Sequence, residues 1–375
     1  MVLHDFDDVA LEDLRLRRSA KWSRYPPDVL PMWVAELDVS LADVVTGELT
    51  DAVTTGDTGY AWPERLAPAF AGFAARQWGW QVEPPRCWAV ADVMVGVGEA
   101  LRMLTSPGDP VVVCPPVYTP FFHVPAEHGR PVVQVPLVDG GLDLAGIDAA
   151  LAAGARAVLL CSPHNPTGRV WAPAELAALD EVARRHAVIV VSDEIHAPLT
   201  LPGATFTPYL AEGPRHAVAV VSASKAFNLA GLKAALLVAG SDDVADRLRR
   251  LPEEVAFRCG HLGVLASVAA WRHGDDWLAD LRAHLDRNRQ LLGELLAAQL
   301  PGVGYAPPQA SYLAWLDFRA VGLEAPAAHL LEHGRVALVE GTDFGAPGAG
   351  FARLNLGTTR AVLEDGVRRM CAARG

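Results

Sequence analysis

The stretch SASKAFNLAGLK, residues 222–233, contains two of the three lysines in this chain of 375 residues. The third is Lys21, and arginine carries the other basic charge. A primary amine forms a Schiff base with an aldehyde and acts as a base when its pKa is lowered, whereas an arginine side chain stays protonated. Lys225 and Lys233, placed among small polar residues, therefore indicate a site that needs an amine.

Strand-like runs and helical patterns alternate through the middle of the chain. Continuous apolar strands separated by helices predict a parallel or mixed sheet covered by helices on both faces. The six runs are DPVVVC (109–114), RPVVQV (130–135), RAVLLCS (156–162), HAVIVVSD (186–193), HAVAVVSAS (216–224) and AALLVAG (234–240).

Polar side chains follow or end four of these runs. Because ligands of open α/β sheets bind beyond the carboxyl ends of the strands, we expect these groups to meet at one edge of the sheet. Taken singly, a strand-end aspartate is more often a helix cap, and a Ser-x-Ser-Lys turn also makes a good N-cap. Capping alone does not explain the whole set. Its members are Tyr118, Asn165, Asp193, Ser222, Ser224 and Lys225.

This combination of side chains suits one cofactor. An amine binds an aldehyde, and a carboxylate keeps a pyridine nitrogen protonated so that the ring withdraws electrons. Serines and backbone N–H groups at the start of a helix bind phosphate. Together these groups predict a site for pyridoxal 5′-phosphate.

The composition argues against several other classes of function. The net charge is −12, so the chain lacks the basic excess that binds nucleic acid or anionic membranes. Apolar runs such as AVIVV (187–191) are too short to span a bilayer, and the acidic N-terminal stretch MVLHDFDDVALEDL has no apolar run. The five cysteines and twelve histidines are dispersed. We therefore expect no metal site and a reduced, cytoplasmic protein.

The pattern changes from about residue 275. A long amphipathic helix is followed by YLAWLDF (312–318), a loop rich in glycine and proline, and a final helix. We interpret this part as a smaller α+β domain that the N-terminal segment joins. The predicted limits are 1–45 for the N-terminal segment, 46–274 for a large cofactor-binding domain and 275–375 for the small domain.

Six motifs are spread over nearly the whole length of the chain. They are PMWVAELD (31–38), GYAW (59–62), SPHNPTG (162–168), SDEIHAPL (192–199), SASKAFNLAGLK (222–233) and FARLNLGTTR (351–360). With these motifs the chain resembles the fold-type I, class I/II aminotransferase-like enzymes of pyridoxal phosphate, and within them the cystathionine β-lyase, or C–S lyase, subgroup of MalY/PatB type. The resemblance implies a mostly parallel, mixed seven-stranded sheet covered by helices, plus the smaller α+β domain.

The resemblance implies a role for each matching residue near the cofactor ring. Lys225 would bind the cofactor as a Schiff base and act as the catalytic base. Asp193 would pair with the pyridine nitrogen, and Asn165 would hydrogen-bond the 3′-oxygen, with His196 close to it. Tyr118 would stack on the face of the ring.

Other residues would bind the phosphate and the substrate. The phosphate would lie on the backbone of Val97 and Gly98, which we expect at a helix start. The substrate α-carboxylate would be clamped by Arg353, with Asn165 and the backbone near Ala35 beside it. The expected remaining phosphate ligands are Ser222, Ser224, Lys233 and, from the neighbouring subunit of a homodimer, Tyr60.

The implied reaction is β-elimination of cystathionine or a related L-cysteine thioether, which gives a thiol, pyruvate and ammonia. An aminotransferase is the close alternative, because the same lysine would return the proton to the cofactor instead of expelling a leaving group. A non-catalytic regulatory protein that keeps the cofactor site is a third reading. Trp33, Tyr312 and Phe344 are candidates for the sulfur side of the pocket.

Overall fold

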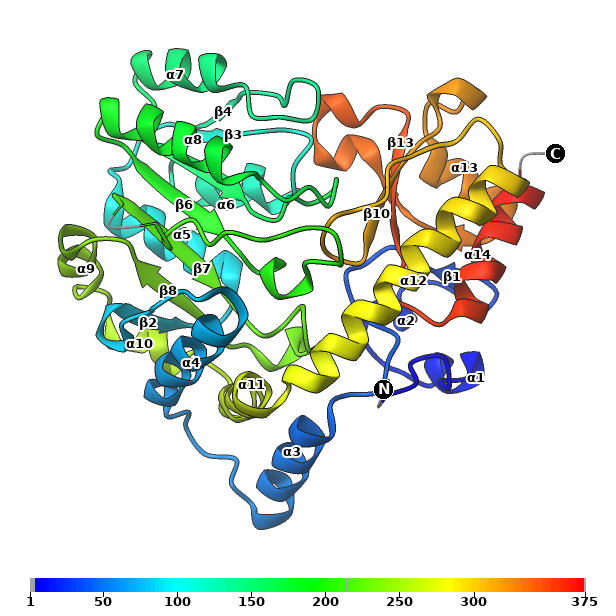
Figure 1. The fold of residues 1–375 in the computed structure, drawn as a ribbon, viewed down its shortest axis with the longest axis horizontal. Coiled ribbons are helices and arrows are strands. Elements are labelled where there is room, and N and C mark those ends of the chain that lie inside the picture. The colour runs from blue at the N-terminus through cyan, green and yellow to red at the C-terminus, as the bar shows by residue number, and fades with distance from the viewer. Residues whose placement is uncertain (1–3, 213–214, 374–375) are drawn as a thin grey trace.

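The structure, a computed structural model, describes residues 4–212 and 215–373. Its largest sheet has seven strands in the order β2-β8-β7-β6-β5-β3-β4 (Figure 1). Strands β3 to β7 run parallel, whereas β8 is antiparallel to both of its neighbours. The predicted mostly parallel, mixed sheet is confirmed. Its strands are β2 (Cys87–Val90), β3 (Val111–Val113), β4 (Val132–Gln134), β5 (Ala157–Cys161), β6 (Ile189–Asp193), β7 (Ala217–Val221) and β8 (Ala235–Ala239).

All six apolar runs identified in the sequence form strands, β3 to β8. The seventh strand, β2, was not predicted. Its four residues, CWAV, are only partly buried except for Val90, because β2 is an edge strand that pairs with β8 alone. A short, half-buried edge strand lacks the continuous apolar run by which the buried strands are recognised.

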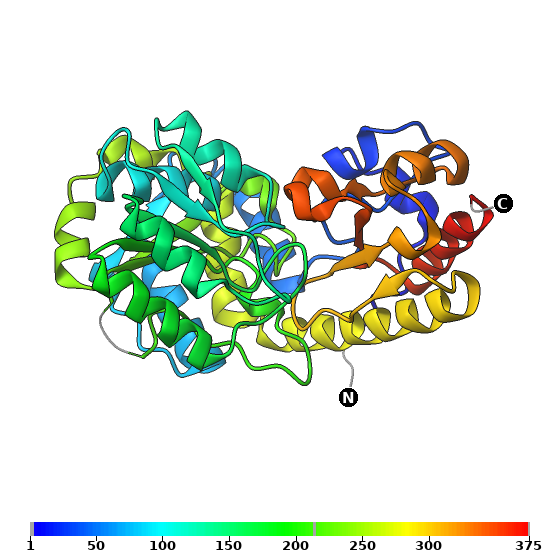
Figure 2. The ribbon, with the colours of Figure 1, turned by 90° about the horizontal axis from the view of Figure 1, so that it is seen from above.

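The sheet separates two apolar cores. Alternate residues of each strand point to opposite faces, so Ile189 and Val191 of β6 join one core and Val190 joins the other. Helices cover both faces (Figure 2). The helices of this part of the chain are α3 (Asp43–Thr55), α4 (Leu66–Trp78), α5 (Val93–Leu104), α6 (Pro120–Glu127), α7 (Leu144–Ala152), α8 (Pro173–Arg185), α9 (Asp242–Leu248), α10 (Glu253–Phe257) and α11 (His261–His273).

A second, four-stranded antiparallel sheet lies in the C-terminal part, with the order β12-β13-β10-β9. The 25-residue helix α12 (Asp275–Gln299) runs from the first part to the second and packs against α14 (Figure 1). Its buried residues recur at helical spacing and include Leu278, Leu281 and Leu285. The remaining elements here are β9 (Gly304–Tyr305), β10 (Leu313–Asp317), α13 (Pro326–Gly334), β11 (Val336–Ala337), β12 (Val339–Glu340), β13 (Phe351–Asn355) and α14 (Arg360–Ala372).

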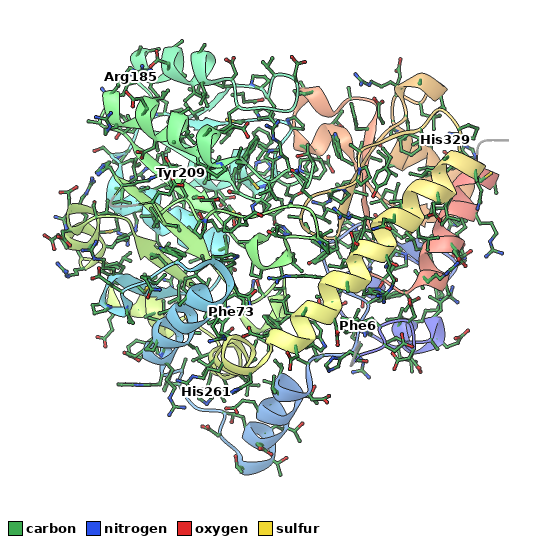
Figure 3. The ribbon with its side chains drawn as sticks, in the orientation of Figure 1. Phe6, Phe73, Arg185, Tyr209, His261 and His329 are labelled. Carbon is green, nitrogen blue, oxygen red and sulfur yellow. The ribbon has the colours of Figure 1, made fainter. Side chains whose placement is uncertain are left out.

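The N-terminal segment packs against this C-terminal part (Figure 2). It contains α1 (Leu11–Arg15), α2 (Ala20–Ser23) and β1 (Leu30–Pro31), and β1 pairs in parallel with β11. Phe6 is buried against Trp277 at the start of α12, with an edge-to-face contact of 5.4 Å between ring centroids (Figure 3). Among the described residues, no helix combines the length and apolar character that crossing a membrane requires.

Candidate active site

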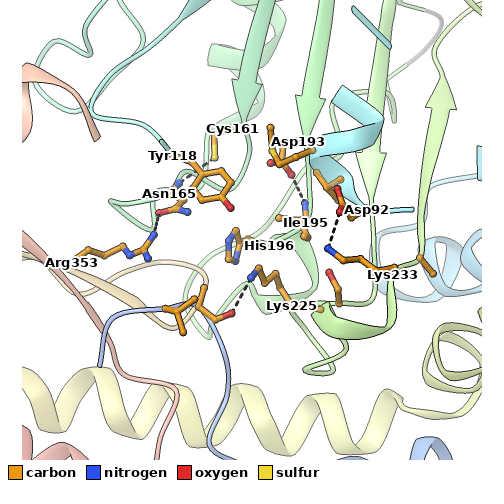
Figure 4. Close-up of a pocket in the computed structure, with 17 residues that line it drawn as sticks. Asp92, Tyr118, Cys161, Asn165, Asp193, Ile195, His196, Lys225, Lys233 and Arg353 are labelled. Atoms are coloured by element: carbon orange, nitrogen blue, oxygen red, sulfur yellow. Dashed lines mark hydrogen bonds and ion pairs between the residues drawn. The ribbon is translucent and has the colours of Figure 1, made fainter. Parts of the chain in front are cut away.

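A pocket opens at the carboxyl ends of the parallel strands, between the large sheet and the C-terminal part (Figure 4). It brings together side chains that the sequence places at successive strand ends. Asp193 ends β6, Asn165 follows β5, and Lys225 follows β7. Arg353, on β13, reaches the pocket from the second sheet. The predicted residues that line the pocket are Ala35, Tyr118, Asn165, Asp193, His196, Ser224, Lys225, Lys233 and Arg353.

Lys225 presents its amine at the centre of this pocket. Its Nζ donates a hydrogen bond to the carbonyl oxygen of Ala35 over 2.9 Å. Burial, followed by the positive charge of Arg353, lowers the pKa of Lys225 to about 8. An amine with this pKa is neutral in a substantial fraction of molecules near neutral pH, which both imine formation and proton abstraction require.

Asp193 is buried opposite the amine. Its Oδ1 accepts the backbone N–H of Ile195 over 3.1 Å, and the side chain is 3% exposed. Burial raises the pKa of Asp193 to about 7, although the Ile195 N–H and the charge of Lys225 act against the rise. A buried carboxylate of this kind gains most from a cationic ligand, such as a protonated ring nitrogen.

Arg353 is the cationic group on the substrate side. Its Nη1 donates to Asn165 Oδ1 over 3.0 Å and its Nη2 donates to the carbonyl oxygen of Trp33 over 3.1 Å. Its Nε is buried and has no partner among the residues described. The guanidinium also lies 4.9 Å from the centre of the Phe344 ring. Arg353 is therefore held in place with hydrogen-bonding capacity left for a carboxylate.

The N-terminus of α5 forms the far end of the pocket. Asp92 is the N-cap, and Val93 and Met94 are the first helical residues, and all three line the pocket. The first N–H groups of a helix have no acceptor within the helix, so this end can bind an anion. Ser224 and Lys233 lie around it.

The expected position of the phosphate site on this helix needs correction. We expected the helix to start at Val97 and Gly98, but it starts at Val93. Val97 and Gly98 lie in the second turn and are buried, and a Cβ on Gly98 would collide with the ring of His128. Their N–H groups are therefore inside the helix, and Gly98 serves close packing instead of phosphate binding.

Ser222 also differs from its expected role. Its hydroxyl donates to the carbonyl oxygen of Ala234 over 2.7 Å and accepts the Ser224 N–H over 3.1 Å. The side chain therefore joins the end of β7 to the start of β8 and shapes the turn that carries Lys225. It is not among the residues that line the pocket.

The chain matches a known family model over residues 70–370, that of "Aminotransferase class I and II". It is 36% identical to the cystathionine β-lyase PatB of Bacillus subtilis (strain 168), over 95% of this chain and 96% of that protein. This is decisive. The protein belongs to the class I and II aminotransferase family.

Two further relatives agree with this membership. A cystathionine β-lyase of Corynebacterium glutamicum is 34% identical over 96% of this chain and 98% of that protein. The crystal structure of cystalysin from Treponema denticola, which contains pyridoxal 5′-phosphate, superposes with a TM-score of 0.92 at 25% identity and covers 99% of this chain and 98% of that one. The resemblance inferred from the six motifs is therefore confirmed.

His196 lies in the pocket of this family member beside Lys225 and Arg353 (Figure 4). Its Nδ1 is 3.0 Å from the hydroxyl of Ser311, which belongs to the C-terminal part. Burial, followed by the charges of Lys225 and Arg353, lowers the pKa of His196 to about 3. The imidazole is thus neutral, and its Nδ1 is hydrogen-bonded to a hydroxyl that can act as either donor or acceptor. Ser311 is 115 positions away in the chain and belongs to no motif identified above, so only the fold reveals its contact with His196.

Residues 30–39, which we call the N-terminal strap, cover one side of the pocket. The Ala35 carbonyl accepts hydrogen bonds from Lys225 Nζ and from the Tyr312 hydroxyl, at 2.9 and 3.1 Å. Asn355 Nδ2 donates to the carbonyl oxygens of Val34 and Glu36, at 2.7 and 2.6 Å. The carbonyl of Ala35 is therefore fixed by several contacts on both sides.

Three residues suggested for the sulfur side are near the pocket without lining it. Tyr312 and Phe344 are fully buried, and Trp33 Nε1 donates a hydrogen bond to the backbone carbonyl oxygen of Lys21 over 3.3 Å. Tyr60 is 91% exposed and does not contribute to the pocket of its own chain.

The histidines are less dispersed than the sequence analysis assumed. His329 and His333 are four residues apart on α13, with ring centroids 4.6 Å apart. In the part of the chain that the structure describes, no group of three or more metal-binding side chains includes them. His329 instead bonds the carbonyl oxygen of Ala373 over 2.9 Å.

Proposed function

We propose that the protein is a pyridoxal 5′-phosphate-dependent carbon–sulfur β-lyase that cleaves cystathionine or a related L-cysteine thioether into a thiol, pyruvate and ammonia. The observation that carries the proposal is the placement of Lys225, Asp193 and Arg353 around one pocket. Relatives named cystathionine β-lyase, at 36% and 34% identity over nearly the whole chain, support this activity over others of the family.

The residues present fit the cofactor. Asp193 offers a buried carboxylate oxygen for a ring nitrogen, Lys225 offers a primary amine for an aldehyde, and the start of α5 offers N–H groups for a phosphate. Asn165 would bond the 3′-oxygen and Tyr118 would cover the ring. When bound, pyridoxal phosphate supplies an electron sink that makes the substrate Cα–H acidic.

The chain's own residues would direct the reaction as follows. Arg353 binds the substrate carboxylate through its remaining N–H donors. The hydrogen bonds that it donates to Asn165 and to the Trp33 carbonyl fix the orientation of the guanidinium. Lys225, whose lowered pKa leaves a fraction of the molecules with a neutral amine, takes the proton from Cα. The C–S bond then breaks, and the electron pair leaves with sulfur as a thiolate. The remaining three-carbon fragment takes up water to give pyruvate and ammonia.

An aminotransferase remains the second candidate, because the matching family model carries that name. Both reactions begin with removal of the Cα proton by the same lysine. They differ in what is consumed and released. A lyase releases pyruvate and thiol without any keto-acid acceptor, whereas an aminotransferase needs the acceptor for turnover.

The decisive test is to incubate the purified protein with cystathionine and no keto acid, and to measure pyruvate and thiol together. We expect equal amounts of both from the wild type and none from Lys225→Ala. Borohydride should bleach the visible cofactor band of the wild type only. Pyruvate release by Lys225→Ala would contradict the proposal, and turnover only in the presence of a keto acid would favour the aminotransferase. A purified protein without cofactor absorbance would favour a regulatory role.

We also propose that the active unit is a cytoplasmic homodimer whose sites are shared between subunits. Large apolar side chains are exposed on α3 and the loop after it, namely Val53 at 60%, Tyr60 at 91% and Trp62 at 62%. Large apolar side chains that are exposed in one chain are often covered at a protein–protein interface. All five cysteines are free thiols.

A further inference from the structure

Lys233 and Asp92 form an ion pair at the anion-binding end of the pocket, with Nζ and Oδ2 2.9 Å apart (Figure 4). We propose that the two residues act as one unit in phosphate binding, and that Lys233 is required chiefly because Asp92 is present. The inference rests on the proposed use of pyridoxal phosphate. It assigns a role to Asp92, which the sequence analysis did not single out.

Asp92 occupies a position that conflicts with phosphate binding. Its Oδ1 accepts the N–H of Val95 over 2.9 Å, so the carboxylate caps the helix whose first N–H groups face the pocket. A carboxylate is favourable at a helix N-terminus on its own. It nevertheless repels a phosphate dianion that approaches the same N–H groups of Val93 and Met94. The site therefore contains a built-in negative charge that must be neutralised.

Lys233 provides that neutralisation through a side chain suited to two anions. Its ammonium has three rotatable donors and so can bond Asp92 and a phosphate at once. A guanidinium directs its donors in a fixed plane, which suits a single bidentate acceptor better. This difference gives a physical reason for a lysine here in a chain that otherwise uses arginine.

The backbone of Lys233 supports a functional reason for this residue. Its φ and ψ are 62° and 80°, in the left-handed region, and its carbonyl oxygen accepts the N–H of Gly260 over 2.8 Å. Glycine adopts this conformation without steric cost, whereas a residue with a Cβ does not. A lysine kept at such a position, with its amine turned to the pocket, indicates that the side chain is needed.

The pair is also within electrostatic reach of the reacting groups. Burial is the main cause of the lowered pKa of Lys225 and of the raised pKa of Tyr118, and the charges of Lys233 and Asp92 add smaller contributions to these two shifts. Lys233 and Asp92 are 53% and 33% exposed, so the pair is open to a ligand that enters the pocket.

The test is a double-mutant cycle on the cofactor-free protein, with the dissociation constant of pyridoxal phosphate as the readout. The variants are Lys233→Met, Asp92→Asn and both together. Asparagine caps helices as well as aspartate does, so α5 is preserved. Lys233→Met should weaken binding roughly 30-fold or more, because it leaves Asp92 unpaired beside the phosphate. Asp92→Asn should change the dissociation constant less than about threefold. The dissociation constant of the double variant should lie within about fivefold of that of Asp92→Asn.

Two controls locate the effect at the phosphate. Pyridoxal, which lacks the phosphate, should bind all four proteins equally well. Arg86→Met, which breaks the exposed pair between Arg86 and Asp242, should leave the affinity for pyridoxal phosphate unchanged. Thermal melting reports the folding of each variant, and Lys233→Gln replaces Lys233→Met if the latter does not fold.

Equal losses from Lys233→Met with and without Asp92 would overturn the inference, because Lys233 would then be an independent phosphate ligand. A parallel loss of pyridoxal binding would overturn it as well. A wild-type protein that binds pyridoxal but not pyridoxal phosphate would contradict the inference alone, whereas one that binds neither would contradict the proposed function.

Discussion

Burial acts in opposite directions on the two central groups of the pocket. It raises the pKa of Asp193 to about 7 and lowers the pKa of Lys225 to about 8. In both cases burial destabilises the charged form of the side chain, so a cationic ligand would stabilise the Asp193 carboxylate and an electrophile can react with the neutral Lys225 amine. Each group is poorly satisfied without a ligand, and the proposed cofactor supplies what both lack. We therefore expect the residues that perform the chemistry to lower the stability of the cofactor-free protein.

The first prediction is that Asp193→Asn stabilises the cofactor-free protein at pH 8. The pKa of Asp193 in the folded state, about 7, is above the value of 3.8 for an unfolded aspartate. Between these pH values the folded protein retains a proton that the unfolded chain has released, so the free energy of unfolding falls as the pH rises. Asparagine avoids this loss, and we expect a gain of a few kcal/mol at pH 8.

Urea unfolding of the cofactor-free proteins between pH 5 and pH 8 measures this effect. The gain from Asp193→Asn should shrink as the pH is lowered, and the variant should bind pyridoxal phosphate more weakly. Asp242→Asn, at an exposed carboxylate, is the matched control and should show no such trend. A gain that is the same at both ends of the pH range would show that the charge of Asp193 is not its cause.

For single residues, the sequence predicts positions well at the ends of buried strands and less well elsewhere. Lys225, Asp193 and Asn165 were placed correctly at strand ends, because apolar runs mark where strands stop. The helix start was misplaced by four residues, although Asp92 is a recognisable N-cap signal. The contact between His196 and Ser311 joins segments far apart in the chain, and only the fold brings them together.

The N-terminal strap shows how one element controls the position of a reactive group. A buried ion pair between Lys21, before the strap, and Asp38 within it has an Nζ–Oδ2 distance of 2.6 Å. Asp38 also accepts the Trp22 Nε1–H over 2.9 Å. Both members of the pair are almost fully buried, so α2 and the strap are fixed to each other. The strap in turn holds the Ala35 carbonyl against Lys225.

The second prediction is that Lys21→Met destabilises the protein strongly. Removing one partner leaves the charge of Asp38 buried and uncompensated, which costs about 3–5 kcal/mol. Arg76→Met, which breaks the more exposed pair between Arg76 and Asp275, is the comparison and should cost less than about 1 kcal/mol for its ion pair. Equilibrium urea unfolding of both variants checks the difference.

The outcome for Lys21 also bears on catalysis. If the strap positions Ala35, the folded fraction of the Lys21→Met protein should show a reduced kcat for pyruvate release. Lys21→Met/Asp38→Asn removes the unpaired charge and should recover part of the stability. Losses that are equal for Lys21→Met and Arg76→Met would contradict a special role for the buried pair.

Elements were predicted unevenly from the sequence, for a physical reason. The strands β3 to β8 and the helix α12 have long apolar or amphipathic patterns, and these were recognised. The edge strand β2 and the short pairing of β1 with β11 leave little trace in the local pattern, because their partners lie far away in the chain.

For the whole molecule, the exposure of Val53, Tyr60 and Trp62 supports the prediction of shared sites. Lys225→Ala and Tyr60→Ala proteins should each be impaired as homodimers. Co-expressed in equal amounts, they should regain roughly a quarter of wild-type pyruvate release, because half of the dimers are hybrids with one complete site.

Sedimentation at several protein concentrations should show a dimer for both variants and for their mixture. Co-expression of Lys225→Ala with a second catalytic variant, Asp193→Ala, is the control and should restore nothing, because both residues belong to the same chain's pocket. Absence of any gain from the Tyr60→Ala mixture would contradict shared sites.

The fold of the whole chain was predicted well, since the six motifs and the strand runs agree on one architecture. The limits 1–45, 46–274 and 275–375 stay a prediction. Two features describe how the parts are connected. Helix α12 runs without interruption from the first part to the second, and the N-terminal segment packs on the C-terminal part.

The scarcity of lysine has a practical consequence for labelling. Lys21 is buried in its ion pair, while Lys225 and Lys233 both line the pocket. Apart from the terminal α-amine, whose labelling is a constant background, an acylating dye or a cross-linker directed at amines therefore finds its targets at the mouth of the pocket. Such reagents, which modify most proteins indiscriminately, would here act as reporters of whether the pocket is filled.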